Sequence, residues 1–275
     1  MKQSRIQYHA PKGINGLELL TCSDVNYHFS PHFHDSYCIW LNSSSAETYT
    51  HKGNSGILQT GDIGIIAPGE VHSNRAFGSE SRHLLTFYLN ANLLQKIATE
   101  ISGISGASME FRTDFHSDPE AYRKLITLWQ TLVNSKSPLE RKSIFYDVIA
   151  LLINRYATHA QQQLNIGKEQ KRTAKIIEQF HDRLDDDLRL DELADLIDCT
   201  PYYLIRFFKK AIGMTPHAYL LLLRLEKAKD LLRQGQSIVD VALATGFSDQ
   251  SHLTRHFKTK FDITPGVYRG QILDH

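Results

Sequence analysis

The sequence predicts a two-domain α+β protein: a β-rich N-terminal domain with appended helices, and an all-helical C-terminal domain. Three observations support this. The first ninety residues form short apolar runs between turn-forming residues, the apolar spacing changes from two to three and four after Asn90, and one helical unit occurs twice near the C-terminus. With 275 residues, the chain is long enough for two domains that each bury a core.

The N-terminal ninety residues are predicted to form a sandwich or a small barrel. The turn signals between the strands include TGD at 60–62 and PGE at 68–70, where glycine supplies backbone torsions that other residues adopt only with strain. The expected strands cover residues 17–23, 36–41, 46–51, 57–60, 62–67 and 84–90.

Helical periodicity follows in residues 92–101, 119–134 and 138–159, for instance at Leu125, Leu128, Trp129 and Leu132. The polar stretch AQQQLNIGKEQ at 160–170 contains a glycine and indicates a linker. The predicted organisation is a first domain over 1–160 (its β part to about 90, its helices over 91–160), a linker over 161–171, and a second domain over 172–270.

The composition is that of an ordinary soluble protein, 41% hydrophobic and 22% charged. Cys22, Cys38 and Cys199 lie far apart and lack CxxC spacing, so neither a disulfide framework nor a thiolate zinc site is expected. The N-terminus lacks the apolar core of a signal peptide, and the longest strongly apolar run, 219–223, is too short to span a bilayer. We therefore expect a cytoplasmic protein without a membrane partner.

Charge is distributed unevenly, although the formal net charge is only +1. Residues 178–198 carry a balance of −7, whereas residues 204–260 carry +6. One interpretation is a basic face that meets phosphates. The other is a pair of ordinary solvated helix faces, and charge alone does not decide between them.

An internal repeat is the strongest signal in the sequence. Upstream, at an offset of 48, Leu190, Leu193 and Ala194 correspond to Ile238, Val241 and Ala242. At an offset of 49 seven pairs are identical: Leu204/Leu253, Arg206/Arg255, Phe208/Phe257, Lys209/Lys258, Thr215/Thr264, Pro216/Pro265 and Tyr219/Tyr268. One unit has therefore gained a residue in its turn.

Each repeat has the pattern of a helix, a tight turn and a second helix. In the first unit a helix over 190–196 is followed by Thr200 as N-cap and Pro201 at the first position of a helix to Lys210. In the second unit the helices cover 238–244 and 249–260. This is helix-turn-helix geometry, whose second helix can enter a DNA major groove. The predicted inward residues of the second helices are Leu204, Phe207, Phe208, Leu253 and Phe257.

A connecting helix is predicted between the units over 216–234, with Thr215 as N-cap and Gly235 after its end. At 1.5 Å per residue it spans about 27 Å, comparable with the roughly 34 Å repeat of DNA once the flanking units are added. One chain could therefore read two successive major-groove segments.

Residues 172–270 resemble the double helix-turn-helix domain of the AraC/XylS family of bacterial transcriptional regulators. The resemblance is carried by LRLDELADLIDCTPYYLIRFFKKAIGMTPHAYLLLLRLEKAKDLL and SIVDVALATGFSDQSHLTRHFKTKFDITPGVYR. It implies a sequence-specific regulator, more often an activator than a repressor, that binds a double-stranded DNA operator. It also implies a homodimer formed through the helices of 119–159 and RNA polymerase as a partner.

The resemblance places base contacts on Tyr202, Ile205, Arg206, Gln250, Ser251, Thr254 and Arg255. Arginine can bind guanine in a bidentate manner and glutamine can bind adenine, whereas an isoleucine offers only contact with a thymine methyl group or no base reading. Phosphate contacts are expected from Lys209, Lys210, Lys258 and Lys260. For each of these residues the alternative is a solvated side chain without a DNA contact.

The N-terminal half resembles the family's usual partner, a cupin-like sensor domain, in HFHDSYCIW and LQTGDIGIIAPGEVHSN. In metal-binding cupins, two histidines, a glutamate and a later histidine hold the ion. His32, His34 and His72 match the three histidines, but Cys38 stands where the glutamate is expected. Three imidazoles could still hold zinc or iron, yet a fourth protein ligand is missing.

If one strand continues from His32, alternate side chains share a face. This face would be an effector pocket for a small polar molecule, lined by His32, His34, Ser36, Cys38 and Trp40, with His72 added by the resemblance. Structural histidines and a metal site remain as alternatives. The preferred prediction is an effector-responsive regulator that is not an enzyme and has no cofactor. The alternatives are a cupin metalloenzyme with a DNA-binding tail, and a regulator whose cupin is purely structural.

Overall fold

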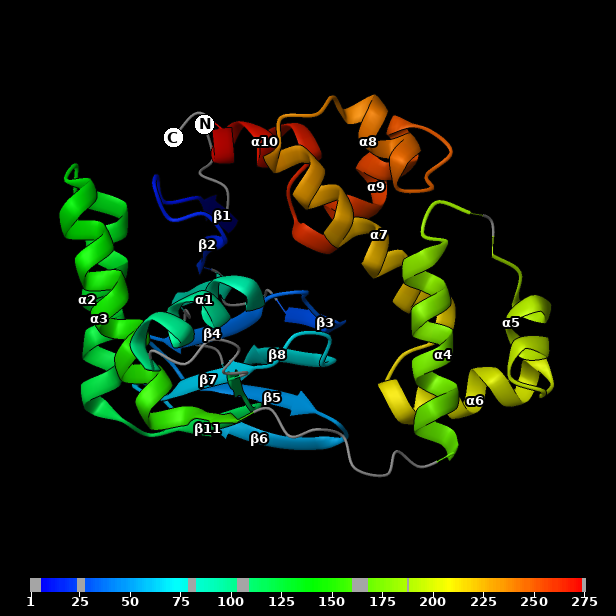
Figure 1. Ribbon diagram of the computed structural model, residues 1–275, viewed down its shortest axis with the longest axis horizontal. Helices are drawn as coiled ribbons and strands as arrows, with labels where there is room; N and C mark the ends of the chain where they lie inside the picture. The colour runs from blue at the N-terminus through cyan, green and yellow to red at the C-terminus, as the bar shows by residue number, and fades with distance from the viewer. Residues whose placement is uncertain are drawn as a thin grey trace. The chain divides into compact units, whose positions relative to one another are not determined.

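Figure 1 shows the computed structural model, which describes residues 6–23, 28–78, 83–102, 109–159, 168–186 and 188–273. The chain divides into two compact units, one up to residue 161 and one from residue 162 to 273. The predicted linker lies mostly outside the described residues, and its end was predicted too late. Helix α4 (Lys168–Asp182) already begins inside the stretch assigned to the linker.

The N-terminal unit is built on two antiparallel sheets. The first has the order β1-β2-β9-β4-β7-β11 and the second β3-β8-β5-β6. The strands of the first sheet are β1 (Ile6–His9), β2 (Leu17–Ser23), β9 (His83–Leu89), β4 (Tyr37–Asn42), β7 (Ile63–Ile66) and β11 (Asp114–His116). Those of the second are β3 (His28–His32), β8 (His72–Ala76), β5 (Glu47–His51) and β6 (Asn54–Leu58). A separate pair joins β10 (Met109–Phe111) to β12 (Ala157–His159).

Strand β4 shows how the two faces of the first sheet are used. Tyr37, Ile39 and Leu41 belong to the main apolar core, which the helices cover. Because side chains alternate across a strand, Cys38 and Trp40 point to the other face, between the sheets. Both faces are buried, so all six residues of β4 are buried. The predicted barrel is thus observed as two facing sheets with buried side chains between them.

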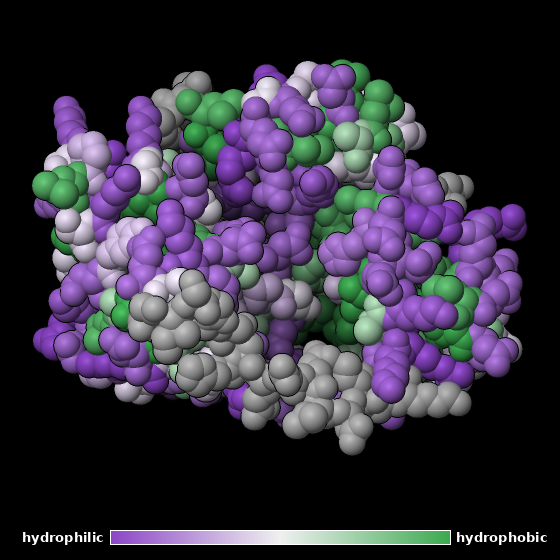
Figure 2. Space-filling view, in the orientation of Figure 1, coloured by the Kyte–Doolittle hydropathy of each residue, from purple (hydrophilic) through white to green (hydrophobic). Residues whose placement is uncertain are grey.

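Helices α1 (Ala91–Ser102), α2 (Pro119–Asn134) and α3 (Pro138–Tyr156) pack on the outer face of the first sheet. The predicted bounds of α2 are confirmed. The prediction of a helix to residue 159 was wrong, because Ala157–His159 form β12 and pair with β10. Leu139 at the start of α3 is 77% exposed, and Figure 2 shows hydrophobic side chains among hydrophilic ones near the free end of the α2–α3 hairpin.

Asp118 joins the two helices of this hairpin. It caps α2 by accepting hydrogen bonds from the backbone N–H groups of Glu120 and Ala121, at 3.1 and 3.0 Å. From the end of α3, Arg155 and Tyr156 also donate to its carboxylate. Burial alone would raise the pKa of Asp118, but the hydrogen bonds from Tyr156 and Ala121 and the charge of Arg155 lower it well below its usual range.

We expect Asp118→Ala to lower the free energy of unfolding of the N-terminal unit by about 1–2 kcal/mol at pH 7, the usual cost of losing a capping side chain. Because the folded-state pKa is depressed, the stabilisation is present above the ordinary aspartate pKa and is lost as the pH falls through the lowered value. Urea unfolding at pH 7 and pH 3, followed by fluorescence, checks this. The wild type and Asp118→Ala should differ less in free energy of unfolding at pH 3 than at pH 7. An equal difference at both pH values would contradict this expectation.

The C-terminal unit is helical throughout the part that the structure describes. After α4 it contains α5 (Leu190–Leu196), α6 (Pro201–Ile212), α7 (Pro216–Arg233), α8 (Ile238–Ala244), α9 (Gln250–Phe261) and α10 (Pro265–Leu273). The predicted N-caps are confirmed, since Thr200 and Thr215 accept from Tyr203 N and Ala218 N. Helix α6 runs two residues past the predicted Lys210 and ends at Gly213, whose φ of +92° suits glycine.

The sequence predicted the apolar strands better than the polar ones. Strands β1, β3, β8, β10, β11 and β12 were not predicted, and β6 covers Asn54–Leu58 rather than 57–60. Strands such as β3 (HFSPH) and β8 (HSNRA) lack an apolar run and are held by pairing with each other. Among the described residues, no helix is long and apolar enough to cross a membrane.

Candidate functional site

The second helix of each repeat presents one apolar and one polar face. In α9, Leu253, Phe257 and Phe261 are buried at a spacing of four residues. Ser251 and Arg255 are exposed on the opposite side, Gln250 is exposed in the first turn, and Thr254 is half-buried. In α6, Leu204, Phe207 and Phe208 are buried, while Arg206 is exposed. The inward residues are therefore confirmed, and the two arginines occupy equivalent outward positions.

The remaining predicted DNA contacts are placed less uniformly. Lys209, Lys210 and Lys258 are exposed near the C-terminal ends of their helices, and Lys260 is half-buried. Tyr202 lies in the first turn of α6, but its side chain is outside the described part of the structure. Ile205 is half-buried and lines an apolar cavity of about 330 Å³ with Phe180, Leu193 and Leu220 among others. This favours the second of the two expectations for Ile205, namely no base reading.

Arg224 on α7 was not singled out in the sequence, yet it ties the two repeats together. Its guanidinium donates to the carbonyl oxygens of Leu184 (Nε, 2.8 Å), Asp186 (Nη2, 2.7 Å) and Gly246 (Nη1, 3.0 Å). Leu184 and Asp186 precede α5, whereas Gly246 lies in the turn between α8 and α9. Position 246 requires glycine, because its φ is +71° and a Cβ there would lie 2.8 Å from Arg224 Cζ.

Two histidines on α9 also escaped the sequence reasoning. His252 and His256 are four residues apart, and their ring centroids lie 4.7 Å from each other. Burial lowers the pKa of His256, as do the nearby charges of His252, Arg255 and His217. The i, i+4 spacing in HLTRHF was the signal that could have found this pair. The lowered pKa favours a neutral His256 beside Arg255 at neutral pH.

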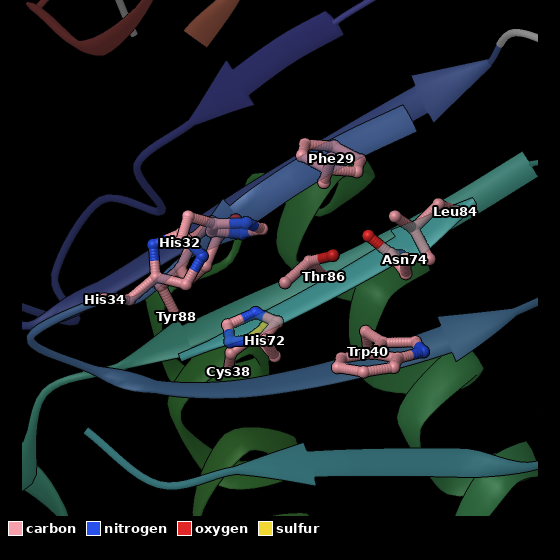
Figure 3. Close-up of a pocket in the computed structure, with 10 residues that line it drawn as sticks. All are labelled: Phe29, His32, His34, Cys38, Trp40, His72, Asn74, Leu84, Thr86 and Tyr88. Carbon is pink, nitrogen blue, oxygen red and sulfur yellow. The ribbon is translucent and has the colours of Figure 1, made fainter. Parts of the chain in front are cut away.

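In the N-terminal unit, a cavity lies between the two sheets (Figure 3). Of the predicted pocket residues, His32, His34, Cys38, Trp40 and His72 line it. The sequence reasoning missed its other lining residues, which are Phe29, Asn74, Leu84, Thr86 and Tyr88. The cavity volume is about 10 Å³, which is room for about one water molecule or ion. An organic ligand of ordinary size needs some 300 Å³ or more.

The prediction for Ser36 was wrong, because residues 32–40 are not one strand. Strand β3 ends at His32 and belongs to the second sheet, while β4 begins at Tyr37 in the first sheet. Ser36 lies in the connection between them and is not among the residues that line the cavity. His32, His34 and Cys38 share the cavity because the two sheets face each other, and not because of alternation along one strand.

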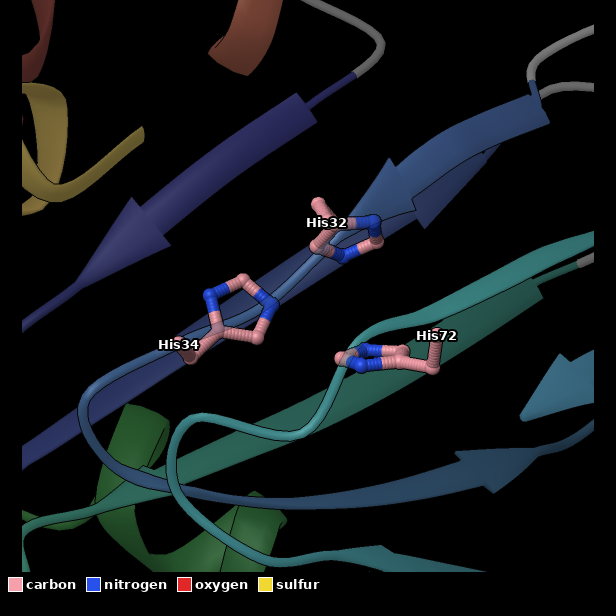
Figure 4. A group of neighbouring side chains, drawn as sticks. All are labelled: His32, His34 and His72. Atoms are coloured by element: carbon pink, nitrogen blue, oxygen red, sulfur yellow. The ribbon is translucent and has the colours of Figure 1, made fainter. Parts of the chain in front are cut away.

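The three histidines converge at one end of this cavity, as Figure 4 shows. One ring nitrogen from each of His32, His34 and His72 lies within 4.8 Å of the other two. The three residues are 3%, 6% and 3% exposed, respectively. In the part of the chain that the structure describes, this is the one group of histidine, cysteine or acidic side chains with metal-binding spacing.

Backbone carbonyl groups fix two of these rings. His32 Nδ1 lies 2.7 Å from the carbonyl oxygen of Ser30, and His72 Nδ1 lies 2.9 Å from that of Glu70. Because a carbonyl oxygen only accepts, each Nδ1 must donate. In the neutral ring, Nε2 then carries the lone pair.

Glu70 connects this end of the cavity to the segment before α2. Its carboxylate accepts hydrogen bonds from Lys52 and Thr113 and lies 2.6 Å from His51 Nε2. Burial would raise the pKa of Glu70, but the hydrogen bonds from Lys52 and Thr113 and the charges of Lys52 and His51 lower it. The residue that orients His72 through its carbonyl is thus itself held by three neighbours.

Both halves of the chain match known families. Residues 193–271 match a family model for a helix-turn-helix domain, and residues 15–149 match the model of the AraC-like ligand binding domain. The chain belongs to the AraC family of transcriptional regulators. As an AraC-family regulator it combines a ligand-binding N-terminal domain with a helix-turn-helix domain that binds DNA.

Relatives match this AraC-family regulator over most of their length. The HTH-type transcriptional regulator YbfI of Bacillus subtilis is 28% identical over 82% of this chain and 81% of its own length. The HTH-type transcriptional activator RhaS of Escherichia coli is 24% identical over 86% of both chains. Wild-type ToxT of Vibrio cholerae, solved with a bound unsaturated fatty acid, has a TM-score of 0.55 at 12% identity, covering 95% of this chain and 97% of ToxT. The ToxT likeness shows the fold.

Proposed function

We propose that this AraC-family regulator activates transcription by reading two successive major-groove segments of one operator with α6 and α9. The observation that carries the proposal is the equivalent outward placement of Arg206 and Arg255 on the two second helices. Arginine bonded to guanine O6 and N7 is the commonest specific base contact. Gln250, Ser251 and Thr254 extend the reading face of α9, while the four lysines named above supply phosphate contacts that set position rather than sequence preference.

The contacts of helix α7 support a separation of α6 and α9 that matches two successive major-groove segments. Helix α7 contacts α6 at one side of the unit and α8, α9 and α10 at the other. Its 18 residues correspond to a length of about 27 Å. DNA presents its major groove again after about 34–36 Å. Arg224, which binds backbone on both sides of α7, would keep the two second helices at a fixed separation.

In this proposal the effector acts at the cavity lined by His32, His34, Cys38, Trp40 and His72. Occupation of this site would shift the population between arrangements with different operator affinity. The chain would act as a homodimer through the α2–α3 hairpin, where Val133 (45% exposed) and Leu139 offer apolar surface. Bound at a promoter in the cytoplasm, the dimer would recruit RNA polymerase.

We propose no catalytic function. The relatives described above are named as transcriptional regulators, and a cavity of about 10 Å³ leaves no room for an organic substrate beside a metal ion.

Selection of random double-stranded DNA by the full chain tests the proposal. We expect an enriched sequence with two conserved elements about one helical turn apart, bound at least about a thousandfold more tightly than unrelated DNA. Arg206→Ala should relax one element and Arg255→Ala the other. Enrichment of no sequence, or of a single element that both variants affect alike, would contradict the two-helix reading.

A further inference from the structure

We propose that the N-terminal unit holds a second ligand site, which binds a small organic anion, that is, a phosphate or carboxylate group joined to an apolar body. The site is a cavity of about 480 Å³. It lies where the connection between β1 and β2, the start of α1 and the first half of α3 meet. The inference goes beyond the proposed function, because that function places the effector between the two sheets.

The size of this cavity suits an organic molecule. Ligand pockets usually measure about 300–1,000 Å³, and the volume of about 480 Å³ lies within that range. The cavity between the sheets, at about 10 Å³, lies far below it. A molecule with an organic body therefore fits the cavity beside α1 and α3 and does not fit the one between the sheets.

Backbone hydrogen bonds hold the wall that the β1–β2 connection contributes. Ile14 N donates to the carbonyl oxygen of Pro11 (3.3 Å), and Asn90 N donates to that of Gly16 (2.8 Å). Gly16 also brings the connection close to α1, because a Cβ at this position would lie 3.3 Å from Asn90 Cβ. Ligand sites are usually largely pre-formed, and these bonds order the wall from within the protein.

Two lysines give the cavity its charge. Lys96 on α1 and Lys142 on α3 line it, and the lining residues that the structure describes include no aspartate or glutamate. Neither lysine forms an ion pair with another described residue. Two like charges that face one cavity repel each other, and an anion between them offsets that repulsion. Lysine is a common partner of phosphate groups.

The acidic residues of α1 and α3 all have other partners. The hydrogen-bonded pairs are Glu100–Tyr146, Glu140–Ser135 and Asp147–Lys124. Tyr146 itself lines the cavity. Burial raises the pKa of its hydroxyl, as do the charge of Glu100 and the hydrogen bond between them. Because these carboxylates are engaged elsewhere, the two lysines leave the cavity positively charged.

The remaining lining residues indicate what is attached to the anionic group. Ile14, Leu93 and Phe145 supply apolar surface. Asn90 caps α1, since its side-chain oxygen accepts a hydrogen bond from Asn92 N at 2.8 Å. A backbone N–H only donates, so the atom that faces it is the amide oxygen, and the amide NH₂ group is left to donate to a ligand. An anion with an apolar body would contact both kinds of surface.

The test titrates the full chain, without DNA, with phenyl phosphate and with benzoate in calorimetry. Both carry an anionic group on an aromatic ring, and together they distinguish a phosphate site from a carboxylate site. Benzyl alcohol is the neutral counterpart. We expect one equivalent of at least one anion per chain, markedly weaker binding of benzyl alcohol, and an affinity for the anion that falls as the salt concentration rises.

Variants of the two lysines locate the site. Lys96→Gln and Lys142→Gln should each weaken binding of the anion at least about threefold, and the double variant at least about tenfold, because two separate contacts add. Lys136→Gln is the matched control. It removes the same charge from an exposed lysine between α2 and α3 that is not among the lining residues, and it should leave the affinity unchanged. Equal affinity of the double variant and the wild type would contradict the site.

A second measurement uses the wild-type chain alone. Acetylation of lysines by an N-hydroxysuccinimide ester, followed by mass spectrometry, should slow at Lys96 and Lys142 when the anion is present, and stay unchanged at Lys136. Protection of Lys209, Lys210 or Lys258 instead would place the anion on the predicted DNA contacts and overturn the site. Absence of saturable binding of both anions, or equally tight binding of benzyl alcohol, also overturns it. Since no DNA is present, such a failure leaves the two-helix reading of the operator untouched.

Discussion

Arg224→Met is expected to destabilise the C-terminal unit by about 2–4 kcal/mol. The side chain donates three hydrogen bonds to backbone carbonyl oxygens that lie far apart in the chain. Hydrogen bonds from a charged group contribute more than neutral ones, and a partner left unsatisfied costs its desolvation. Methionine keeps most of the volume but none of the donors, so the loss reports the hydrogen bonds rather than a cavity.

The two tryptophans allow each unit to be followed separately. Trp40 and Trp129 both lie in the N-terminal unit, so fluorescence reports that unit, while circular dichroism includes the helices of the C-terminal unit. With urea m-values of about 1–3 kcal/mol per molar, the circular dichroism midpoint should fall by about 1–2 M. The fluorescence midpoint should stay unchanged.

Two variants control for this result. Lys227→Met removes an exposed charge from the same helix and should change stability by no more than about 0.5 kcal/mol. Arg224→Lys keeps the charge, but a compact ammonium group cannot reach three carbonyl groups in the planar arrangement of guanidinium. Arg224→Lys should therefore destabilise the C-terminal unit nearly as much as Arg224→Met does. Full stability of the lysine variant would mean that charge, rather than the three-way geometry, joins the repeats.

Arg255→Ala is expected to weaken binding to the selected operator by about 1–3 kcal/mol and to relax the preference at one base pair. The side chain is exposed on α9, opposite the buried Leu253 and Phe257, so its removal should leave the fold intact. Fluorescence anisotropy with the operator and with each single-base variant at one fixed salt concentration measures both effects.

Lys258→Ala is the matched control on the same helix, one turn further along and equally exposed. A lysine that contacts phosphate should weaken binding to all sequences alike and reduce the dependence of log K on log salt by about one. If Arg255→Ala shows this uniform behaviour instead, Arg255 contacts the DNA backbone, and the base-reading assignment is wrong.

The helical half of the protein could be predicted closely because its signals are local. Threonine followed by proline starts α6 and α7, and glycine ends them, so the bounds follow from a few neighbouring residues. The apolar residues that repeat at an offset of 49 are the ones that pack inside the unit. Arg224 could not be predicted in this way, because its three partners lie 22 to 40 residues away in the sequence.

The histidine cavity could be predicted only in part. The sequence named five of its lining residues, four of them through an alternation argument that the structure does not follow and His72 through the resemblance. His32 and Cys38 come from different sheets, and Asn74, Thr86 and Tyr88 enter through pairing of β8 with β3 and of β9 with β4. Polar strands such as HSNRA carry no apolar period, so cross-strand pairing places them.

The sequence by itself thus determined the family, the two-domain class and the outward positions of Arg206 and Arg255, because a local helical period decides which side chains face the core. Only the tertiary structure decided how large the cavity is, that Ser36 lies outside it, and that the nitrogens of His32, His34 and His72 meet. These depend on the contact of two sheets, which long-range pairing and packing set and which no local pattern encodes.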